Sequence, residues 1–329
     1  MPTLRELFDA LTLPDRTLGP PHFSAQPVPG HEAHRVAKDA DGSPCLLLYV
    51  SPTRSAVSPP PTLLSHLAVQ YDVRCRVSRP DQPSEESIFT LIRCLSSEPI
   101  LMAKFLDVME VVVRAIGGTP TADRVRRAIG DLVELFRSLE RPPLKSVRGV
   151  WAELFVIANS HDPRRLAPAW HATPGEAFDF SEGGDRIEVK AVAGSSRAHY
   201  FSLDQIYPPR EARVLIVSLF VEALAGGTAI KNLLDTVRRR LALYPELALR
   251  IETLIAHGLG KSWAPAMEES FDWQRAVDSI QFLEPHAIPA VPRELPREVT
   301  EVRFRSDISA SASLNVDDAR QMGGLFEAL

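Results

Sequence analysis

The sequence is short of cysteine, lysine and net charge, and it lacks a long apolar run; each shortage excludes a class of protein. Its three cysteines, Cys45, Cys75 and Cys94, are widely spaced in apolar stretches, so we expect buried, reduced thiols and neither a disulfide framework nor a zinc site. No run of about 18 apolar residues occurs, which argues against a membrane span. The formal net charge of −5 excludes a general polycation, so any contact with nucleic acid must come from a local basic surface.

The remaining composition is that of a globular protein with more than one core. The 329 residues are 45% hydrophobic and 24% charged, and a single domain of that length would be unusually large. The first residues are amphipathic and lack the apolar core of a signal peptide. We therefore expect a cytoplasmic protein without membrane contact.

The beginning of the chain predicts a β-rich α+β domain. Alternating or apolar stretches predict strands in three regions, at 34–50 (a hairpin with an Asp-Gly turn), 69–78 and 87–96. A helix should follow with Ser97 as its cap and Pro99 in its first turn, and a second helix should span 121–140. We expect this domain to recognise DNA or a partner protein.

A proline-rich segment, RPPLK at 141–145, is the best boundary, and it divides the chain into domains 1–140 and 141–329. The second domain begins with a pattern typical of an α/β fold: a helix over 147–160 capped by Ser146, a hairpin over 177–192, a strand and short helix over 198–206, and a buried strand over 212–223. Further elements are predicted at 228–243 and 245–258 (helices), 279–284 and 298–309 (strands) and 316–328 (a helix), with a short strand near 168–172.

The hairpin FDFSEGGDRIEVKAV (178–192) carries an unusual set of charges. Glu188 and Lys190 must share one face of their strand, because successive side chains of a strand point to opposite faces. If the two strands lie side by side, Asp179 can approach Glu188 within the span of one hydrated metal ion. Lys190 is the only lysine between positions 146 and 230, in a chain with six lysines and 31 arginines.

Two interpretations of this hairpin stay open on the residues alone. A solvated sheet face would carry the same charges without a function, and Glu182 and Asp185 compete with Asp179 as partners of Glu188 because the register is not fixed. Alternatively, the carboxylates bind Mg²⁺, which proteins commonly hold through one or two carboxylates, waters and substrate phosphate oxygens. Glu153, on a flank of the preceding helix, would add a third acid. A lysine beside such an ion can donate to a phosphate or position a water.

Four stretches, GVWAELFVIA, AFDF, RIEVK and HYFSLDQI, resemble the PD-(D/E)XK restriction-endonuclease-like superfamily. The resemblance is closest to a bacterial group whose genes often neighbour phage-defence genes. It covers about residues 146–225 for the nuclease core and, more loosely, the whole chain. The resemblance implies an α/β fold with a restriction-endonuclease-like core, in which a central mixed sheet flanked by helices follows the order αβββαβ.

The resemblance also implies roles for individual residues. The helix acid of the family matches Glu153, its metal-binding aspartate matches Asp179, and its acid–lysine pair matches Glu188 and Lys190. The polar residue that follows the next strand in some members matches Gln205. One position departs from the pattern, since Phe178 stands where the motif has proline.

The implied activity is hydrolysis of a DNA phosphodiester with Mg²⁺ or Mn²⁺, in a restriction or phage-defence system. Asp179 and Glu188, with the Val189 carbonyl, would bind the metal, Lys190 would act on the water or phosphate, and Glu153 would orient a water or complete a second metal site. A homodimer would allow double-strand cleavage, and proteins of a defence operon are further expected partners. Two alternatives are a catalytically inactive nuclease-like scaffold or DNA-binding subunit of a defence complex, and a DNA repair nuclease or junction resolvase.

Two histidines, His171 and His199, flank the hairpin. The nine histidines show no metal-ligand spacing, so we interpret both as surface or core residues rather than as part of a site.

Overall fold

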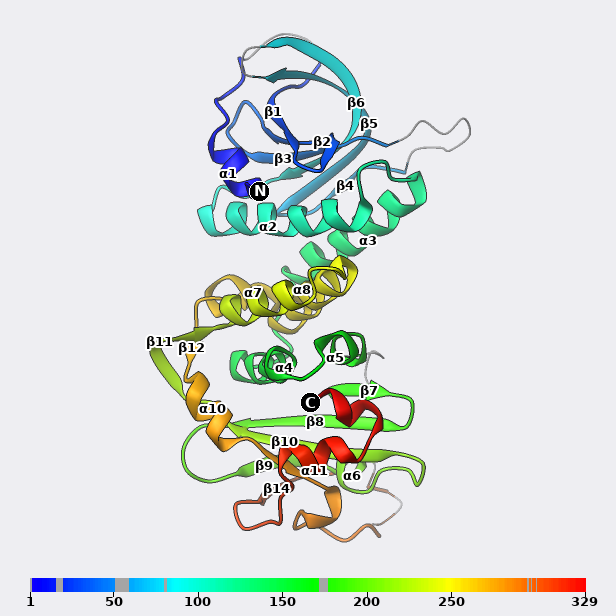
Figure 1. Ribbon diagram of the computed structural model, residues 1–329, viewed down its shortest axis with the longest axis vertical. Coiled ribbons are helices and arrows are strands. Elements are labelled where there is room, and N and C mark those ends of the chain that lie inside the picture. Colours follow the sequence, from blue (N-terminus) through cyan, green and yellow to red (C-terminus); the bar gives the residue numbers. More distant parts are fainter. Residues whose placement is uncertain are drawn as a thin grey trace. The chain divides into compact units, whose positions relative to one another are not determined.

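The structure is a computed structural model, in which the chain folds into two compact units. The first consists of Met1–Pro142 and Tyr244–Ala264, and the second of Pro143–Leu243 and Pro265–Leu329. The structure describes residues 2–15, 20–50, 59–79, 82–171, 177–294, 296, 298–299 and 301–329. Each unit is described by itself below (Figure 1).

A six-stranded sheet forms the core of the first unit. Its strands are β1 (His22–Val28), β2 (His31–Lys38), β3 (Pro44–Leu48), β4 (Thr62–Leu63), β5 (Leu67–Arg79) and β6 (Gln82–Cys94), in the order β1-β2-β3-β6-β5-β4. A further parallel pairing of β1 with β5 closes the sheet on itself. The predicted alternation of β5 is present, since Cys75 and Val77 are fully buried in the core together with Cys45. All three cysteines are buried and free, as predicted.

Helices complete the first unit: α1 (Leu4–Asp9), α2 (Pro99–Ile116), α3 (Ala122–Ser138) and α8 (Pro245–Leu259). The helix predicted over 121–140 is α3, which Thr121 caps, but the cap of α2 is Glu98, so the prediction of Ser97 was wrong by one residue. The domain prediction assigned α8 to residues 141–329, whereas in the structure α8 packs against α2 and α3. The apolar face of an amphipathic helix does not specify its partner, and this one is buried within the first unit.

A mixed four-stranded sheet lies at the centre of the second unit, in the order β13-β10-β8-β7. Its strands are β7 (Phe180–Glu182), β8 (Asp185–Val192), β10 (Arg213–Phe220) and β13 (Gln281–Leu283). The predicted hairpin is therefore present as antiparallel β7 and β8, and the predicted apolar strand is β10, parallel to β8. Seven consecutive residues of β10 are buried, as expected for a strand covered on both faces.

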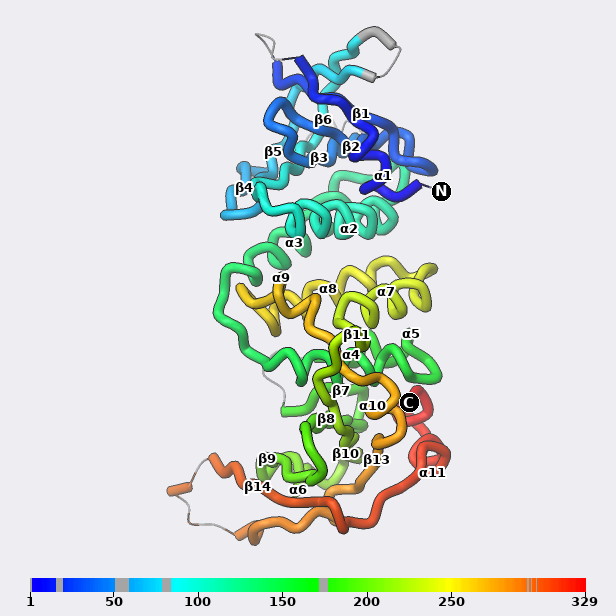
Figure 2. The backbone as a smooth tube through the Cα atoms, turned by 90° about the vertical axis from the view of Figure 1, so that its left-hand side faces the viewer, coloured from blue at the N-terminus to red at the C-terminus, as the bar shows by residue number. Residues whose placement is uncertain are grey.

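The third strand of the predicted αβββαβ order lies outside this sheet. Strand β9 (Ala198–Ser202) pairs with β14 (Arg303–Asp307) in a separate two-stranded sheet, where Phe201 lies opposite Phe304. Figure 2 shows β9, β14 and the short helix α6 (Leu203–Ile206) together. The expectation of three successive strands in one sheet was thus wrong for β9, because the C-terminal strand takes it as a partner.

Helices α4 and α10 pack against strands of the four-stranded sheet of the second unit. Helix α4 (Val147–Asn159) begins at its predicted cap, Ser146, and packs on β8 and on α7 (Ile230–Arg240). Of the strand expected near 168–172, residues 168–169 instead end a helix, α5 (Pro163–Ala169), Trp170 makes an isolated bridge, and residue 172 lies outside the described residues. The remaining elements are β11 (Ala223–Ala229), α9 (Trp263–Ala266), β12 (Ser270–Phe271), α10 (Trp273–Ser279) and α11 (Val316–Gln321). Within the described residues, no helix is long and apolar enough to cross a membrane.

Candidate active site

The register of the β7–β8 hairpin brings Asp179 to Glu188. Phe180 pairs with Ile187, so the residue before Phe180 lies opposite Glu188. The contact is anchored by the backbone, since the Val189 amide donates to Asp179 Oδ2 at 2.9 Å. Both acids are buried, with exposed fractions of 8% for Asp179 and 7% for Glu188. The sequence left this register open, and the structure selects the pairing that unites these two carboxylates.

The two competing acids are engaged elsewhere, at the turn of the hairpin. Arg165 donates twice to Glu182 Oε2, at 2.7 and 2.9 Å. Arg213 makes a two-point ion pair with Asp185, at 2.8 Å for each bond, and the Leu325 amide donates to Asp185 Oδ2 at 2.8 Å. Glu182 and Asp185 therefore tie the hairpin to α5, β10 and the C-terminal residues.

Glu153 reaches the same region from α4. It is 4% exposed although it carries a carboxylate. Its Oε2 accepts from Trp170 Nε1 at 2.8 Å and lies 2.9 Å from His171 Nε2, while its Oε1 accepts from Lys145 Nζ at 2.6 Å. The segment after α5 thus fixes the orientation of this acid.

Lys145 is a residue of the site that the sequence did not reveal. Its Nζ lies 2.6 Å from Glu153 Oε1, 3.0 Å from Asp179 Oδ1 and 2.9 Å from His171 Nε2. It stands directly before Ser146, one residue outside the stretch in which Lys190 is the only lysine. The scarcity of lysine was the one signal in the sequence that could have pointed to Lys145. The RPPLK segment that contains it indicates only a domain boundary.

His171 also lies in this cluster, although the sequence interpretation placed it outside the site. Its backbone amide donates to the Asp179 carbonyl at 2.8 Å, and its backbone adopts a positive φ of 44°. One ligand atom each from Glu153, His171 and Asp179 lies within 4.8 Å of the others, close enough to hold a metal ion. His199 is a core residue as expected: it is buried, with Nε2 2.8 Å from Ser218 Oγ.

Lys190 and Gln205 complete the site on the other side of Glu188. Lys190 Nζ donates to Glu188 Oε1 at 2.7 Å and to Gln205 Oε1 at 3.1 Å, and it lies 5.2 Å from the centre of the Phe201 ring. Gln205 is held by its own bonds, since its Nε2 donates to the Ala177 carbonyl and its Oε1 accepts from the Ser202 amide. Helix α6 therefore fixes the position of the ammonium group.

The three acids influence one another electrostatically. Burial and the Asp179 charge raise the pKa of Glu188 to about 8, in spite of Lys190. Burial and the Glu153 charge likewise raise the pKa of Asp179. Burial disfavours the charged form of Glu153 too, but His171 and Lys145 outweigh it and lower its pKa to about 2. Buried carboxylates that repel one another in this way are stabilised as anions by a cation.

The donor set fits a divalent metal ion. Carboxylate oxygens are the ligands that Mg²⁺ and Mn²⁺ prefer, and a histidine nitrogen is compatible with Mn²⁺. Glu153, Asp179 and Glu188 supply such oxygens from α4, from the residue before β7 and from β8. Among the described residues, Glu153, His171 and Asp179 could therefore hold a metal ion, whereas Glu188 lies outside that group of three and accepts from Lys190 Nζ at 2.7 Å.

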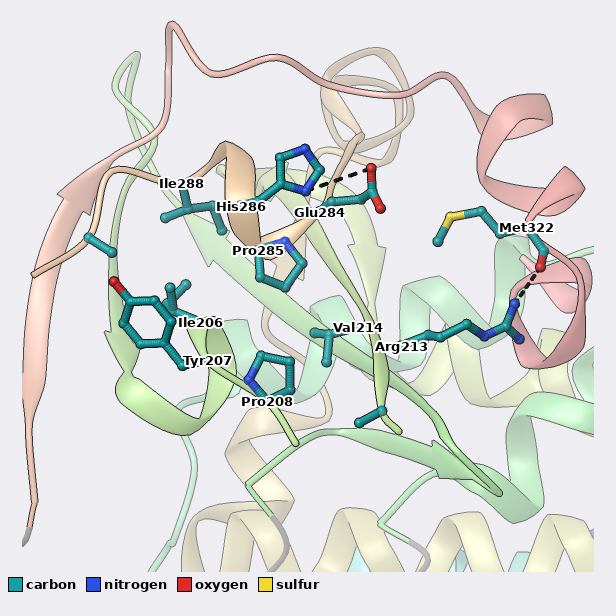
Figure 3. A pocket seen from close by; sticks show the side chains of 12 residues that line it. Ile206, Tyr207, Pro208, Arg213, Val214, Glu284, Pro285, His286, Ile288 and Met322 are labelled. Atoms are coloured by element: carbon teal, nitrogen blue, oxygen red, sulfur yellow. Dashed lines mark hydrogen bonds and ion pairs between the residues drawn. The ribbon is translucent and has the colours of Figure 1, made fainter. Parts of the chain in front are cut away.

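A cavity of about 560 Å³ lies next to α6 but is separate from the acids (Figure 3). Ile206, Val214 and Ile288 line it with apolar side chains, and His286 and Glu284 lie at one side of it. None of the five predicted site residues contributes to its lining. The cavity is therefore separate from the cluster of acids and lysines.

Comparison with known families gives one match. The model of the family described as "Putative PD-(D/E)XK family member, (DUF4420)" matches residues 4–309. No curated protein and no solved structure matches the chain. The match spans all the residues of the site described above.

Proposed function

Since the chain belongs to this PD-(D/E)XK family, we propose that it is a metal-dependent endonuclease that hydrolyses DNA phosphodiester bonds with Mg²⁺ or Mn²⁺. The observation that carries the proposal is the convergence of Glu153, Asp179, Glu188 and Lys190 in one buried cluster. These residues come from three segments (α4, the residue before β7, and β8), so their meeting is a property of the fold. On this proposal α4, β7, β8, β9, α6 and β10 form the restriction-endonuclease-like core, with β9 displaced toward β14.

Each side chain has a role that its surroundings support. Asp179 and Glu188, with the Val189 carbonyl, would hold the metal, which stabilises charge on the phosphate and makes a bound water more nucleophilic. Lys190 donates to the phosphate or orients the attacking water, and Gln205 keeps its ammonium in place. Glu153 orients a water or completes a second metal site.

The biological setting follows from the resemblance alone. We propose a role in restriction or phage defence, with DNA as the substrate, a homodimer for double-strand cleavage and proteins of a defence operon as partners. The first unit would then recognise DNA or a partner. The localisation in this proposal is cytoplasmic.

Cleavage of defined DNAs tests the proposal. We expect the purified chain to nick supercoiled plasmid with Mg²⁺ or Mn²⁺ and not with EDTA, and Asp179→Asn to reduce nicking to background because a metal ligand is lost. Arg165→Gln, which changes the ion pairs with Glu182 at the hairpin turn and with Glu327, is the matched control and should cleave normally. Phage and branched DNAs, with and without operon partners, separate a defence nuclease from a junction resolvase. Metal-independent nicking, or nicking equal in Asp179→Asn and parent, would contradict the proposal.

One observation favours a second candidate, a nuclease-like subunit without activity. Lys145 places an ammonium among Glu153, Asp179 and His171, where a metal would otherwise neutralise the acids. A silent subunit would keep that ammonium permanently. It should then show no change in thermal stability on addition of Mn²⁺, whereas an active site should be stabilised.

A further inference from the structure

We propose that Lys145 competes with the divalent cation for the same carboxylate oxygens, so that its ammonium must leave before the metal binds. This inference rests on the proposed function, because it concerns how the same site is loaded. It assigns Lys145 a role as a displaceable internal cation, distinct from that of Lys190.

The distances make joint occupancy unfavourable. Mg²⁺ binds oxygen at about 2.0–2.1 Å, and Lys145 Nζ lies 2.6 Å from Glu153 Oε1. A metal on that oxygen would therefore be less than about 5 Å from the ammonium. Asp179 Oδ1 and His171 Nε2 also contact Nζ, so the ammonium occupies the space between three candidate metal donors. Two cations this close in a buried site repel each other strongly.

The charge balance leads to the same conclusion. Once a metal has displaced the proton of Glu188, the three carboxylates (Glu153, Asp179 and Glu188) and two ammonium groups leave one negative charge. A divalent ion added to this set would make the site positive, but a divalent ion that replaces Lys145 makes it neutral. Exchange of the Lys145 ammonium for the metal therefore leaves the carboxylates paired with cations both before and after the metal binds.

Lys145 is the lysine that can leave. It precedes the cap of α4 and lies outside any helix or strand, and its side chain is 31% exposed. Lys190, in contrast, lies in the central strand β8, is 15% exposed and is held by Glu188 and Gln205. Solvent therefore offers Lys145 a place to move to, whereas Lys190 is fixed.

Titration calorimetry with Mn²⁺ tests the competition without any cleavage assay. Lys145→Met keeps an unbranched side chain that is one atom shorter and removes the charge, and it should bind Mn²⁺ about tenfold more tightly than the parent. In EDTA the same variant should melt at a lower temperature than the parent, and Mn²⁺ should raise its melting temperature by more. Lys231→Met makes the same chemical change at a lysine paired with Glu268, so it should bind like the parent.

The outcomes separate this inference from the proposed function. If the parent binds Mn²⁺, Asp179→Asn does not, and Lys145→Met binds no more tightly than the parent, the competition is refuted and the metal site stands. If neither the parent nor Lys145→Met binds Mn²⁺ at millimolar concentration, the proposed function fails, and the inference fails with it. Lys145→Gln serves as a second variant if the methionine variant does not fold.

Discussion

The two ends of the β7–β8 hairpin differ in the groups that pair with their acidic side chains. At the turn, Glu182 and Asp185 each face an arginine in a two-point contact, and a backbone amide completes Asp185. Farther along the strands, Asp179 and Glu188 face lysines, and the pKa of Glu188 is raised to about 8 by burial and by the Asp179 charge. Of the four carboxylates of this hairpin, the two at the turn are therefore fully paired, and the two at the other end repel each other.

The difference shows how charge is used in this fold. The planar guanidinium of arginine matches a carboxylate at two points, whereas a lysine ammonium is a compact charge on a flexible stem that can be exchanged. Even Gly324 contributes to the fixed end, since a Cβ there would clash with Asp185 Oδ2. The turn is thus fixed by arginine pairs, and the lysine end is the part that we propose binds the metal.

The largest expected effect concerns the lysine end. Lys190→Met should lower the rate of plasmid nicking by at least about 100-fold, because a positioned ammonium beside the phosphate is lost. Its circular dichroism spectrum should match that of the parent. Arg213→Met at the turn is the matched control: the folded fraction of that variant should cleave at the parental rate. Equal loss of cleavage in both variants would remove the distinction between the two ends.

For the free energy of unfolding, we expect the larger loss from a substitution at the turn and the smaller loss from one at the lysine end. Asp185→Asn places an amide where three donors now point, so we expect the free energy of unfolding to fall by about 2 kcal/mol, less than for a fully buried pair because Arg213 is partly exposed. Asp179→Asn keeps an acceptor for the Val189 amide and should cost less than about 1 kcal/mol. Urea unfolding of both variants measures this. If Asp179→Asn lost more unfolding free energy than Asp185→Asn, the turn would not be the end of the hairpin that stabilises the fold.

A smaller effect should depend on pH. Because the pKa of Glu188 is raised to about 8 from an ordinary value of 4.5, the folded state keeps a proton that the unfolded state releases between these values. The stabilising contribution is thus complete at low pH and is lost as pH rises toward 8. In EDTA, Glu188→Gln should abolish on the order of 1–2 kcal/mol of this pH dependence between pH 5 and 8. If the melting temperatures of the parent and of Glu188→Gln fell equally between pH 5 and 8, the raised pKa of Glu188 would be disproved.

The sequence predicted those parts of the site that lie on regular elements. Alternation along a strand placed Glu188 and Lys190 on one face, and the Gly-Gly turn brought Asp179 within reach. It did not predict Lys145 or His171, because they lie outside helices and strands and meet the acids through contacts between distant segments. Local periodicity contains no information about such contacts.

In the fold, too, local signals were predictable from the sequence and long-range contacts were not. The helices α3 and α4 begin at caps that the sequence displays, Thr121 and Ser146. Strand β11 was missed, since its ALAGGTA segment combines small residues with two glycines that are poor strand formers. The partners of β9 and of α8 depend on long-range packing that an isolated segment does not reveal.

The central claim is that the acids from three segments bind one divalent cation at the lysine end of the hairpin. The most direct test is a crystal structure grown with Mn²⁺, with data collected at the manganese absorption edge. The account predicts an anomalous peak bound by Asp179 and Glu188, with Lys145 turned away from Glu153. A map with no peak among these acids, and with Lys145 still between Glu153 and Asp179, would contradict it.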